Sequence, residues 1–112
     1  MLILATKLKN AINRAAPADW NYALEYKLKN IVVNGNKFGC SGFIRNPKND
    51  AIVYVSTEEP CLSSLHYMYR YADSFTDYLG YHNRWADTLE ELVDGIIECL
   101  RTPVREAKDF RV

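Results

Sequence analysis

Hydrophobic residues change their spacing several times along this chain, and each change predicts a new structural element. Over residues 2–16 apolar side chains recur at helical spacing, and Pro17 ends the pattern because proline cannot extend a helix. Over residues 22–29 apolar and polar residues alternate, which is typical of a half-buried strand. Residues 31–33 extend this strand, and we expect a bulge at Asn30.

The middle of the chain predicts three further strands. Asn34-Gly35 favours a tight hairpin turn, since both residues accept positive φ, and a return strand follows over residues 37–45. Residues 46–50 predict a second turn, and residues 51–57 form a β-branched strand. Residues 65–72 alternate again and predict a fourth strand, after which Ser74 and Asp77 predict a short capped turn of helix.

The pattern is clearest in a final helix over residues 89–101. Thr88 and Glu91 have the spacing of a capping box, and Thr102-Pro103 stops the helix. Its core-facing stripe consists of Leu89, Leu92, Val93, Ile96, Ile97 and Leu100. Gly95 lies within this helix, where glycine is unfavourable, so we expect a close approach to the sheet there.

These elements predict the fold class. A helix at each end of four consecutive strands gives an α+β fold, in which an antiparallel four-stranded meander packs against an N-terminal and a C-terminal helix as a two-layer sandwich. With 112 residues, of which 48% are hydrophobic, we expect a single domain over residues 1–112.

Composition limits the cellular setting. The chain has no window of 18 uncharged apolar residues, so we expect no membrane span, and its apolar start is too short for a signal peptide and has no basic region before it. Cys40, Cys61 and Cys99 are odd in number and widely spaced, which fits reduced thiols better than a disulfide scaffold. We therefore expect a cytoplasmic protein.

The formal net charge of zero hides an asymmetry. Residues 1–48 carry eight lysines and arginines against two acids, whereas residues 49–112 carry six against twelve. Direct nucleic-acid binding is not expected, because it requires a net basic face. The opposite charges of the two halves would permit attraction between the halves or, head to tail, between neighbouring copies. The alternative is that they are solvated faces of two different elements.

Motifs of catalysis are absent from the sequence. Neither a phosphate-binding glycine loop nor a nucleophile elbow is present, and His66 and His82 lack metal-ligand spacing with any cysteine or carboxylate. We therefore expect no enzyme activity, no metal and no cofactor.

Residues 65–85 concentrate five of the eight tyrosines, both histidines and two arginines. Tyrosine rings can stack on a base, and an arginine fork can bind phosphate. The residues that we expect to face a ligand are Tyr67, Tyr69, Arg70, Tyr71, Asn83, Arg84 and Trp85, with Arg45 and Arg101 as phosphate partners. The alternative is that the tyrosines pack beneath a helix. The functional interest would then move to Arg70, residues 81–85 and the acidic last helix.

The segment FGCSGFIRNPKNDAIVYVST, followed by YRYADSFTDYLGYHNRWADTLEELVDGI, resembles the small counter-defence proteins of bacteriophages. Among these, the Thoeris anti-defence type sequesters signals similar to cyclic ADP-ribose, and anti-CRISPR proteins share the same general profile. The resemblance implies a non-enzymatic inhibitor and assigns a role to no single residue.

Three hypotheses follow. The first is a binding protein that sequesters a nucleotide-like signalling molecule in a pocket completed by a homo-oligomer. The second is a protein-binding inhibitor that blocks a host nuclease or regulator, in which an acidic face of Asp87, Glu90, Glu91 and Asp94 contacts the host defence protein. The third is a small structural protein whose tyrosine face is a subunit interface.

Overall fold

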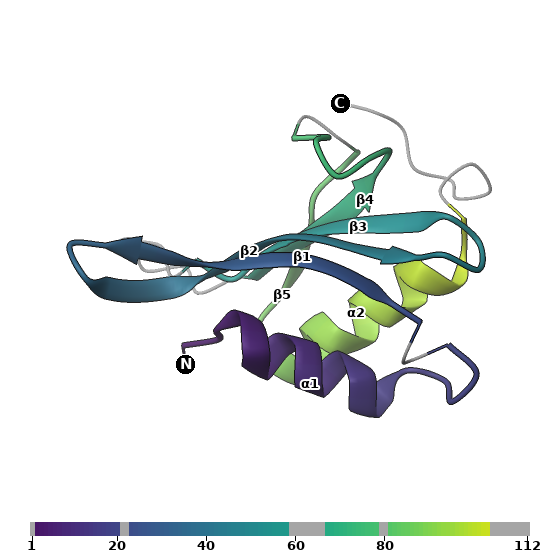
Figure 1. The fold of residues 1–112 in the computed structure, drawn as a ribbon, viewed down its shortest axis with the longest axis horizontal. Helices are drawn as coiled ribbons and strands as arrows, with labels where there is room; N and C mark the ends of the chain where they lie inside the picture. Colours follow the sequence, from purple (N-terminus) through teal and green to yellow (C-terminus); the bar gives the residue numbers. More distant parts are fainter. Residues whose placement is uncertain (1, 21–22, 59–66, 79–80, 104–112) are drawn as a thin grey trace.

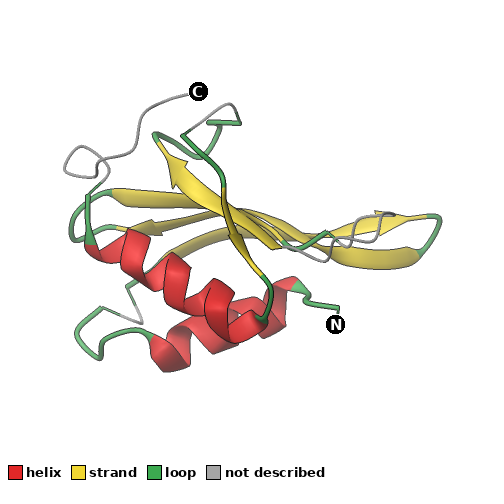
Figure 2. Cartoon of the chain, turned by 180° about the vertical axis from the view of Figure 1, so that it is seen from behind, coloured by secondary structure: helices red, strands yellow, loops and turns green. Residues whose placement is uncertain are grey.

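The computed structural model describes residues 2–20, 23–58, 67–78 and 81–103. Within them five strands form one antiparallel sheet in the order β1-β2-β3-β4-β5, and two helices cover one of its faces (Figure 1, Figure 2). The elements are α1 (Ala5–Ala15), β1 (Glu25–Val33), β2 (Asn36–Asn46), β3 (Ala51–Ser56), β4 (Tyr67–Ala72), β5 (Arg84–Ala86) and α2 (Leu89–Arg101). The predicted α+β meander with a helix at each end is confirmed, with five strands in place of four.

The helix α1 is shorter than predicted because its first turn is capped from the sheet. Leu4 provides no side-chain cap, and the backbone N–H of Ala5 donates instead to Oδ1 of Asn30 on β1 at 2.8 Å. Leu8 and Ile12 bury the apolar stripe, and the helix ends before Pro17. The start of α1 is therefore tied to the strand it packs against.

The helix α2 follows its sequence pattern closely. Oγ1 of Thr88 accepts a hydrogen bond from the N–H of Glu91 at 3.1 Å, whereas the Glu91 carboxylate accepts from the N–H of Asp87, one residue before the usual capping-box donor. A Cβ atom on Gly95 would lie 2.3 Å from the ring of Tyr69. This contact confirms the expected close approach between α2 and the sheet.

The hairpin between β1 and β2 turns at Asn34 and Gly35, which adopt φ angles of 51° and 80°. The expected bulge lies on the other strand. Ile31 pairs with Gly39 and Val32 with Lys37, so Phe38 of β2 is the extra residue. Asn30 itself pairs regularly with Cys40.

Two expectations in the second half of the chain need correction. The strand β5 replaces part of the loop expected over residues 81–85 and pairs with β4, and its three residues are too few to produce a recognisable alternation. No helical turn forms at residues 74–77, where Ser74 Oγ accepts from the N–H of Thr76 at 3.2 Å and so stabilises a non-helical turn. The predicted positions Tyr22, Cys61, Leu65 and His66 lie outside the described residues.

The main core lies between the helices and the sheet. Ile44, Val53 and Tyr71 are cross-strand neighbours on β2, β3 and β4, so they share this face. The side chains with no exposed surface include Leu8, Ile12, Ile44, Val53, Val55, Leu92, Ile96 and Leu100. Such burial removes apolar surface from water and is the main stabilising contribution to the fold.

Two buried polar side chains connect distant parts of this core. Oγ1 of Thr57 donates to the carbonyl of Ile3 at 2.7 Å and accepts from the N–H of Cys40 at 3.0 Å. Nδ2 of Asn46 donates to the carbonyl of Leu100 at 3.0 Å, close to the C-terminus of α2. Both side chains supply hydrogen bonds to backbone groups in the interior.

Candidate functional site: a groove on the outer face of the sheet

The face of the sheet opposite the helices, here called the outer face, carries its own small apolar cluster. Phe43 of β2, Ile52 of β3 and Ala72 of β4 are buried there, and Tyr54 and Phe75 pack against them. Phe75 belongs to residues 73–78, a segment that crosses this face after β4. The outer face therefore combines strand side chains with the aromatic rings of one crossing segment.

Arg70 fixes this segment to the sheet. Its side chain is only 3% exposed, and its Nη2 donates to the carbonyl of Asp77 at 2.9 Å while its Nη1 donates to the carbonyl of Tyr71 at 3.1 Å. Its guanidinium also lies 4.7 Å from the ring centroid of Tyr54, within the range of a cation–π contact. Oδ2 of Asp77 accepts from the N–H of Asp73 and closes the turn.

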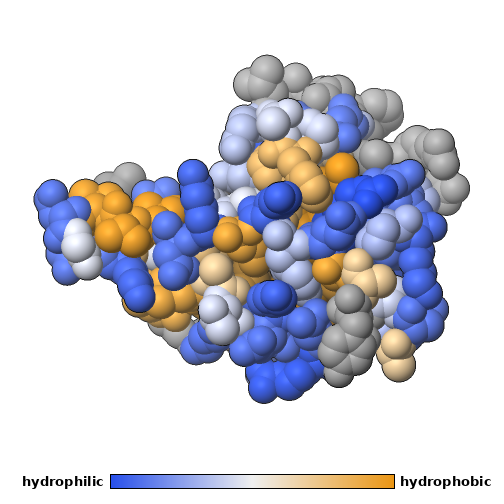
Figure 3. Space-filling view, viewed as in Figure 1, coloured by the Kyte–Doolittle hydropathy of each residue, from blue (hydrophilic) through white to orange (hydrophobic). Residues whose placement is uncertain are grey.

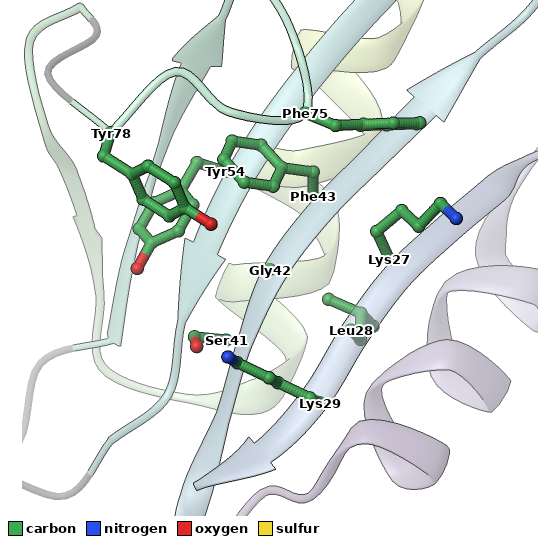
Figure 4. Close-up of a pocket in the computed structure, with 9 residues that line it drawn as sticks. All are labelled: Lys27, Leu28, Lys29, Ser41, Gly42, Phe43, Tyr54, Phe75 and Tyr78. Atoms are coloured by element: carbon green, nitrogen blue, oxygen red, sulfur yellow. The ribbon is translucent and has the colours of Figure 1, made fainter.

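A groove of about 460 Å³ opens beside this aromatic cluster (Figure 4). Its lining combines four aromatic rings, two lysines and the backbone between them: Lys27, Leu28, Lys29, Ser41, Gly42, Phe43, Tyr54, Phe75 and Tyr78. Figure 4 shows the rings of Phe43, Tyr54 and Tyr78 grouped on one side and the two lysines of β1 on the other. The volume lies within the range typical of small-molecule sites.

The aromatic wall is built by edge-to-face contacts. The ring of Tyr78 lies 5.3 Å from that of Phe43 and 6.0 Å from that of Tyr54, with interplanar angles of 71° and 75°. Tyr78 nevertheless remains 68% exposed. An exposed ring already held by two neighbours loses little freedom when a planar ligand stacks on it.

The groove is electropositive. Lys27 and Lys29 are exposed, and neither ammonium has a hydrogen-bond or ion-pair partner within residues 2–20, 23–58, 67–78 and 81–103. No carboxylate is among the lining residues, and the neighbouring Glu25 is paired with Arg45, which also pairs with Asp50. The hydrogen bond to Glu25 is the main reason that the pKa of the Arg45 guanidinium lies above its ordinary value, and the hydrogen bond to Asp50 adds to it. The two lysines are therefore available to an anion.

Gly42 makes the floor of the groove possible. It adopts a φ of +147°, and a Cβ atom there would lie 1.9 Å from the carbonyl oxygen of Lys27 on the adjacent strand. Only glycine permits this approach of β2 to β1.

The structure separates the residues that the sequence predicted as one ligand face. Tyr67 and Tyr71 are 6% and 4% exposed and belong to the core beneath the helices, and Tyr69 is half-buried against Gly95. Arg70 points to the opposite side of β4. These tyrosines therefore do not form an open binding face. They pack beneath the helices, as in the alternative given by the sequence.

The other predicted positions lie apart from one another. Arg84 packs over the ring of Tyr71 at 5.6 Å, and Trp85 of β5 is 59% exposed and cross-strand to Met68. Asn83 is exposed just before β5, Arg101 is exposed at the end of α2, and Arg45 is engaged by Glu25 and Asp50.

The predicted acidic face forms on one helix and its entry. Asp87, Glu90, Glu91 and Asp94 are all exposed. A second groove of about 400 Å³ runs between the two helices, and its lining includes Arg14 of α1 and Glu90 and Asp94 of α2. Its lining charges are mixed, in contrast with the groove on the outer face.

The sequence contained a partial signal for the groove. The alternation over residues 22–29 already separated the exposed Lys27 and Lys29 from the half-buried Tyr26 and Leu28. Tyr54, Phe75 and Tyr78 come from a buried strand and a turn, and no spacing in the sequence relates them to those lysines.

No family model, curated protein or solved structure matches this chain. Among the described residues, no helix is long and apolar enough to cross a membrane, and no cluster of histidine, cysteine or carboxylate side chains could hold a metal ion.

Proposed function

We propose that the groove on the outer face binds a nucleotide-like small molecule. The observation that carries this proposal is the combination of an aromatic wall with two exposed lysines that have no partner in the described part of the chain. A planar base and an attached phosphate require these two features, placed side by side.

Each part of such a ligand has a counterpart in the groove. The base stacks on the exposed ring of Tyr78, and stacking on an aromatic side chain is worth about 1–3 kcal/mol per base. Phosphate oxygens accept hydrogen bonds from Lys27 and Lys29. Ser41 and Tyr54 also line the groove, and their hydroxyl groups are suited to hydrogen bonds with a ribose.

The resemblance to phage counter-defence proteins extends this proposal to a biological role. A binder of this kind lowers the free concentration of a nucleotide signal without transforming it. This extension rests on the resemblance of the sequence alone, as do a host-cytosol setting and a homo-oligomer.

Thermal unfolding in the presence of nucleotides tests the binding proposal. We expect AMP, ADP, ADP-ribose and a cyclic dinucleotide to raise the unfolding midpoint, with larger shifts for the tighter binders at equal concentration, because a ligand that binds only the folded state stabilises it. Adenosine, which lacks phosphate, serves as the matched control and should give a smaller shift. The absence of any shift at high micromolar nucleotide would overturn the proposal.

A second candidate function uses the acidic face. The exposed carboxylates of Glu90 and Asp94 border the groove between α1 and α2, which could receive a basic side chain of a partner protein. Pull-down from a host lysate with wild type and with a Glu90→Lys/Glu91→Lys variant discriminates the two. Loss of a captured protein in the variant supports this second function, whereas unchanged nucleotide binding in the same variant supports the first.

A further inference from the structure

The strand β1 is an open edge of the sheet. It is the outermost strand in the order, and it is nine residues long. None of its backbone groups hydrogen-bonds outside the β1–β2 pairing within the described ranges. Such an edge is a template for a further strand, and proteins usually cover or guard it.

The far end of this edge projects beyond the helices. Figure 1 shows the β1–β2 hairpin extending past α1, and Figure 3 shows apolar residues gathered at its tip. Val32, Val33 and Phe38 are 54%, 52% and 36% exposed there. One end of the edge is thus apolar, while the other end carries charge.

The charges decide what this edge accepts. Lys27 and Lys29 share one face of β1 with Ile31 and Val33, since residues two apart in a strand point the same way. The antiparallel register that would pair all nine residues of two copies places Lys29 opposite its own copy. Like charges directly opposite one another destabilise a strand pair, so β1 disfavours a second copy of itself.

A strand that carries acidic residues opposite these lysines would instead be stabilised on β1. We infer that β1 docks an extended segment of a partner protein as a sixth, antiparallel strand, with two acidic residues facing Lys29 and Lys27 and two apolar residues facing Val33 and Ile31. Main-chain hydrogen bonds supply affinity, and the alternate side chains supply specificity. The same lysines that reject a second copy therefore select this partner.

A designed peptide provides the probe. It has nine residues, with valine at positions one and three, glutamate at positions five and seven, and threonine elsewhere, so that full pairing with β1 places them opposite Val33, Ile31, Lys29 and Lys27. Fluorescence anisotropy should detect its binding to the wild-type protein. A peptide with lysine in place of both glutamates should bind at least about tenfold more weakly, because two cross-strand charge pairs are reversed.

Reversing the charges on β1 should reverse the preference between the two peptides. The Lys27→Glu/Lys29→Glu variant should bind the peptide with two lysines more tightly than the peptide with two glutamates. The control variant Lys9→Glu/Arg14→Glu has the same change in net charge, placed on α1, and should still prefer the peptide with two glutamates. Equal preferences in the two variants would contradict a site on β1 and indicate attraction by net charge only.

Backbone methylation separates strand pairing from simple ionic attraction. In an antiparallel pair only alternate N–H groups face the neighbouring strand. Methylation of the peptide nitrogens at either the odd or the even positions should therefore abolish binding, and methylation at the other set should leave it intact. Retained binding in both versions would overturn the proposal. Sizing chromatography that shows a dimer paired through β1 would also overturn it.

The groove and the edge share two lysines but are tested separately. Tyr78→Ala alters the aromatic wall without changing any residue of β1, so it should leave strand pairing with the peptide unchanged. Nucleotide binding that fails while the peptide still binds would overturn the groove proposal alone, and the reverse result would overturn only the docking strand.

Discussion

The guanidinium of Arg70 lies 4.7 Å from the ring centroid of Tyr54, on the face of the sheet opposite α1 and α2. The two residues are cross-strand partners on β3 and β4. Arg70 also donates to the carbonyl of Asp77, so one buried cation positions both a strand aromatic and the segment that carries Phe75 and Tyr78. The shape of the groove therefore depends on a residue that does not line it.

Replacement of Arg70 should loosen this arrangement. Arg70→Met retains bulk but removes the hydrogen bonds that Arg70 donates to the carbonyls of Tyr71 and Asp77, and we expect a loss of about 2–4 kcal/mol in the free energy of unfolding. Urea denaturation measures this loss. Hydrogen exchange should also show faster exchange over residues 73–78 than over α2, and uniform acceleration of both would contradict a local role.

Gly42 should resist substitution more than any turn glycine. Gly42→Ala places a Cβ atom 1.9 Å from the carbonyl oxygen of Lys27, so the strands must separate, and we expect a loss of about 3 kcal/mol or more. Gly35→Ala provides the control, because its positive φ is unfavourable but nothing lies within 4 Å, and a loss of about 1–2 kcal/mol is expected. Equal losses would show that β1 and β2 can move apart freely.

Thr57 should be sensitive to removal of its hydroxyl group alone. Thr57→Val keeps the side-chain shape but leaves the buried N–H of Cys40 and the carbonyl of Ile3 unpaired, which costs about 1–3 kcal/mol. Thr6→Val on the exposed side of α1 should change stability by less than about 0.5 kcal/mol. Chemical denaturation measures the stability of both variants. Equal losses at Thr57 and Thr6 would contradict a specific role for the buried hydroxyl group of Thr57.

The stability of the protein should fall at alkaline pH. Burial raises the pKa of Tyr26 above its ordinary value of 10.0, because the ionised phenol is disfavoured in the folded state. The stabilising contribution of the neutral phenol is complete below 10.0 and is lost as the pH rises above it, since the unfolded chain then ionises first.

Urea denaturation on either side of pH 10.0 measures this contribution. Tyr26→Phe should reduce the alkaline loss, although at neutral pH it forfeits the hydrogen bond to Asn13 Oδ1, worth about 1 kcal/mol. An identical alkaline loss in wild type and variant would exclude Tyr26 as a cause.

The fold could be predicted to a large extent because its signals are local. The stripe of α2, the Asn34-Gly35 turn and the alternation of β1 each arise from neighbouring residues, and each is present in the structure. The strand β5 was missed, since three residues do not establish a period. The start of α1 depends on Asn30, which is 25 positions away along the chain, so helical spacing could not locate it.

The site was predicted less well, for a physical reason. Alternation placed Tyr67, Tyr69 and Tyr71 on one face of β4, but either face of that strand could have been buried. The register with β3 decides it, because Tyr69 and Tyr71 are opposite the buried Val55 and Val53. The groove joins β1, β2, β3 and residues 73–78, and only tertiary packing brings these segments together.

The central claim is that Lys27 and Lys29 bind the phosphate of a nucleotide whose base stacks on the adjacent rings. Calorimetric titration of ADP-ribose into three proteins tests it most directly: wild type, Lys27→Gln/Lys29→Gln and the charge-matched control Lys9→Gln/Lys37→Gln. We predict one equivalent bound by wild type and control, weakened about tenfold or more in the first variant. Equal affinities for the two variants, or no binding by wild type at high micromolar ligand, would contradict it.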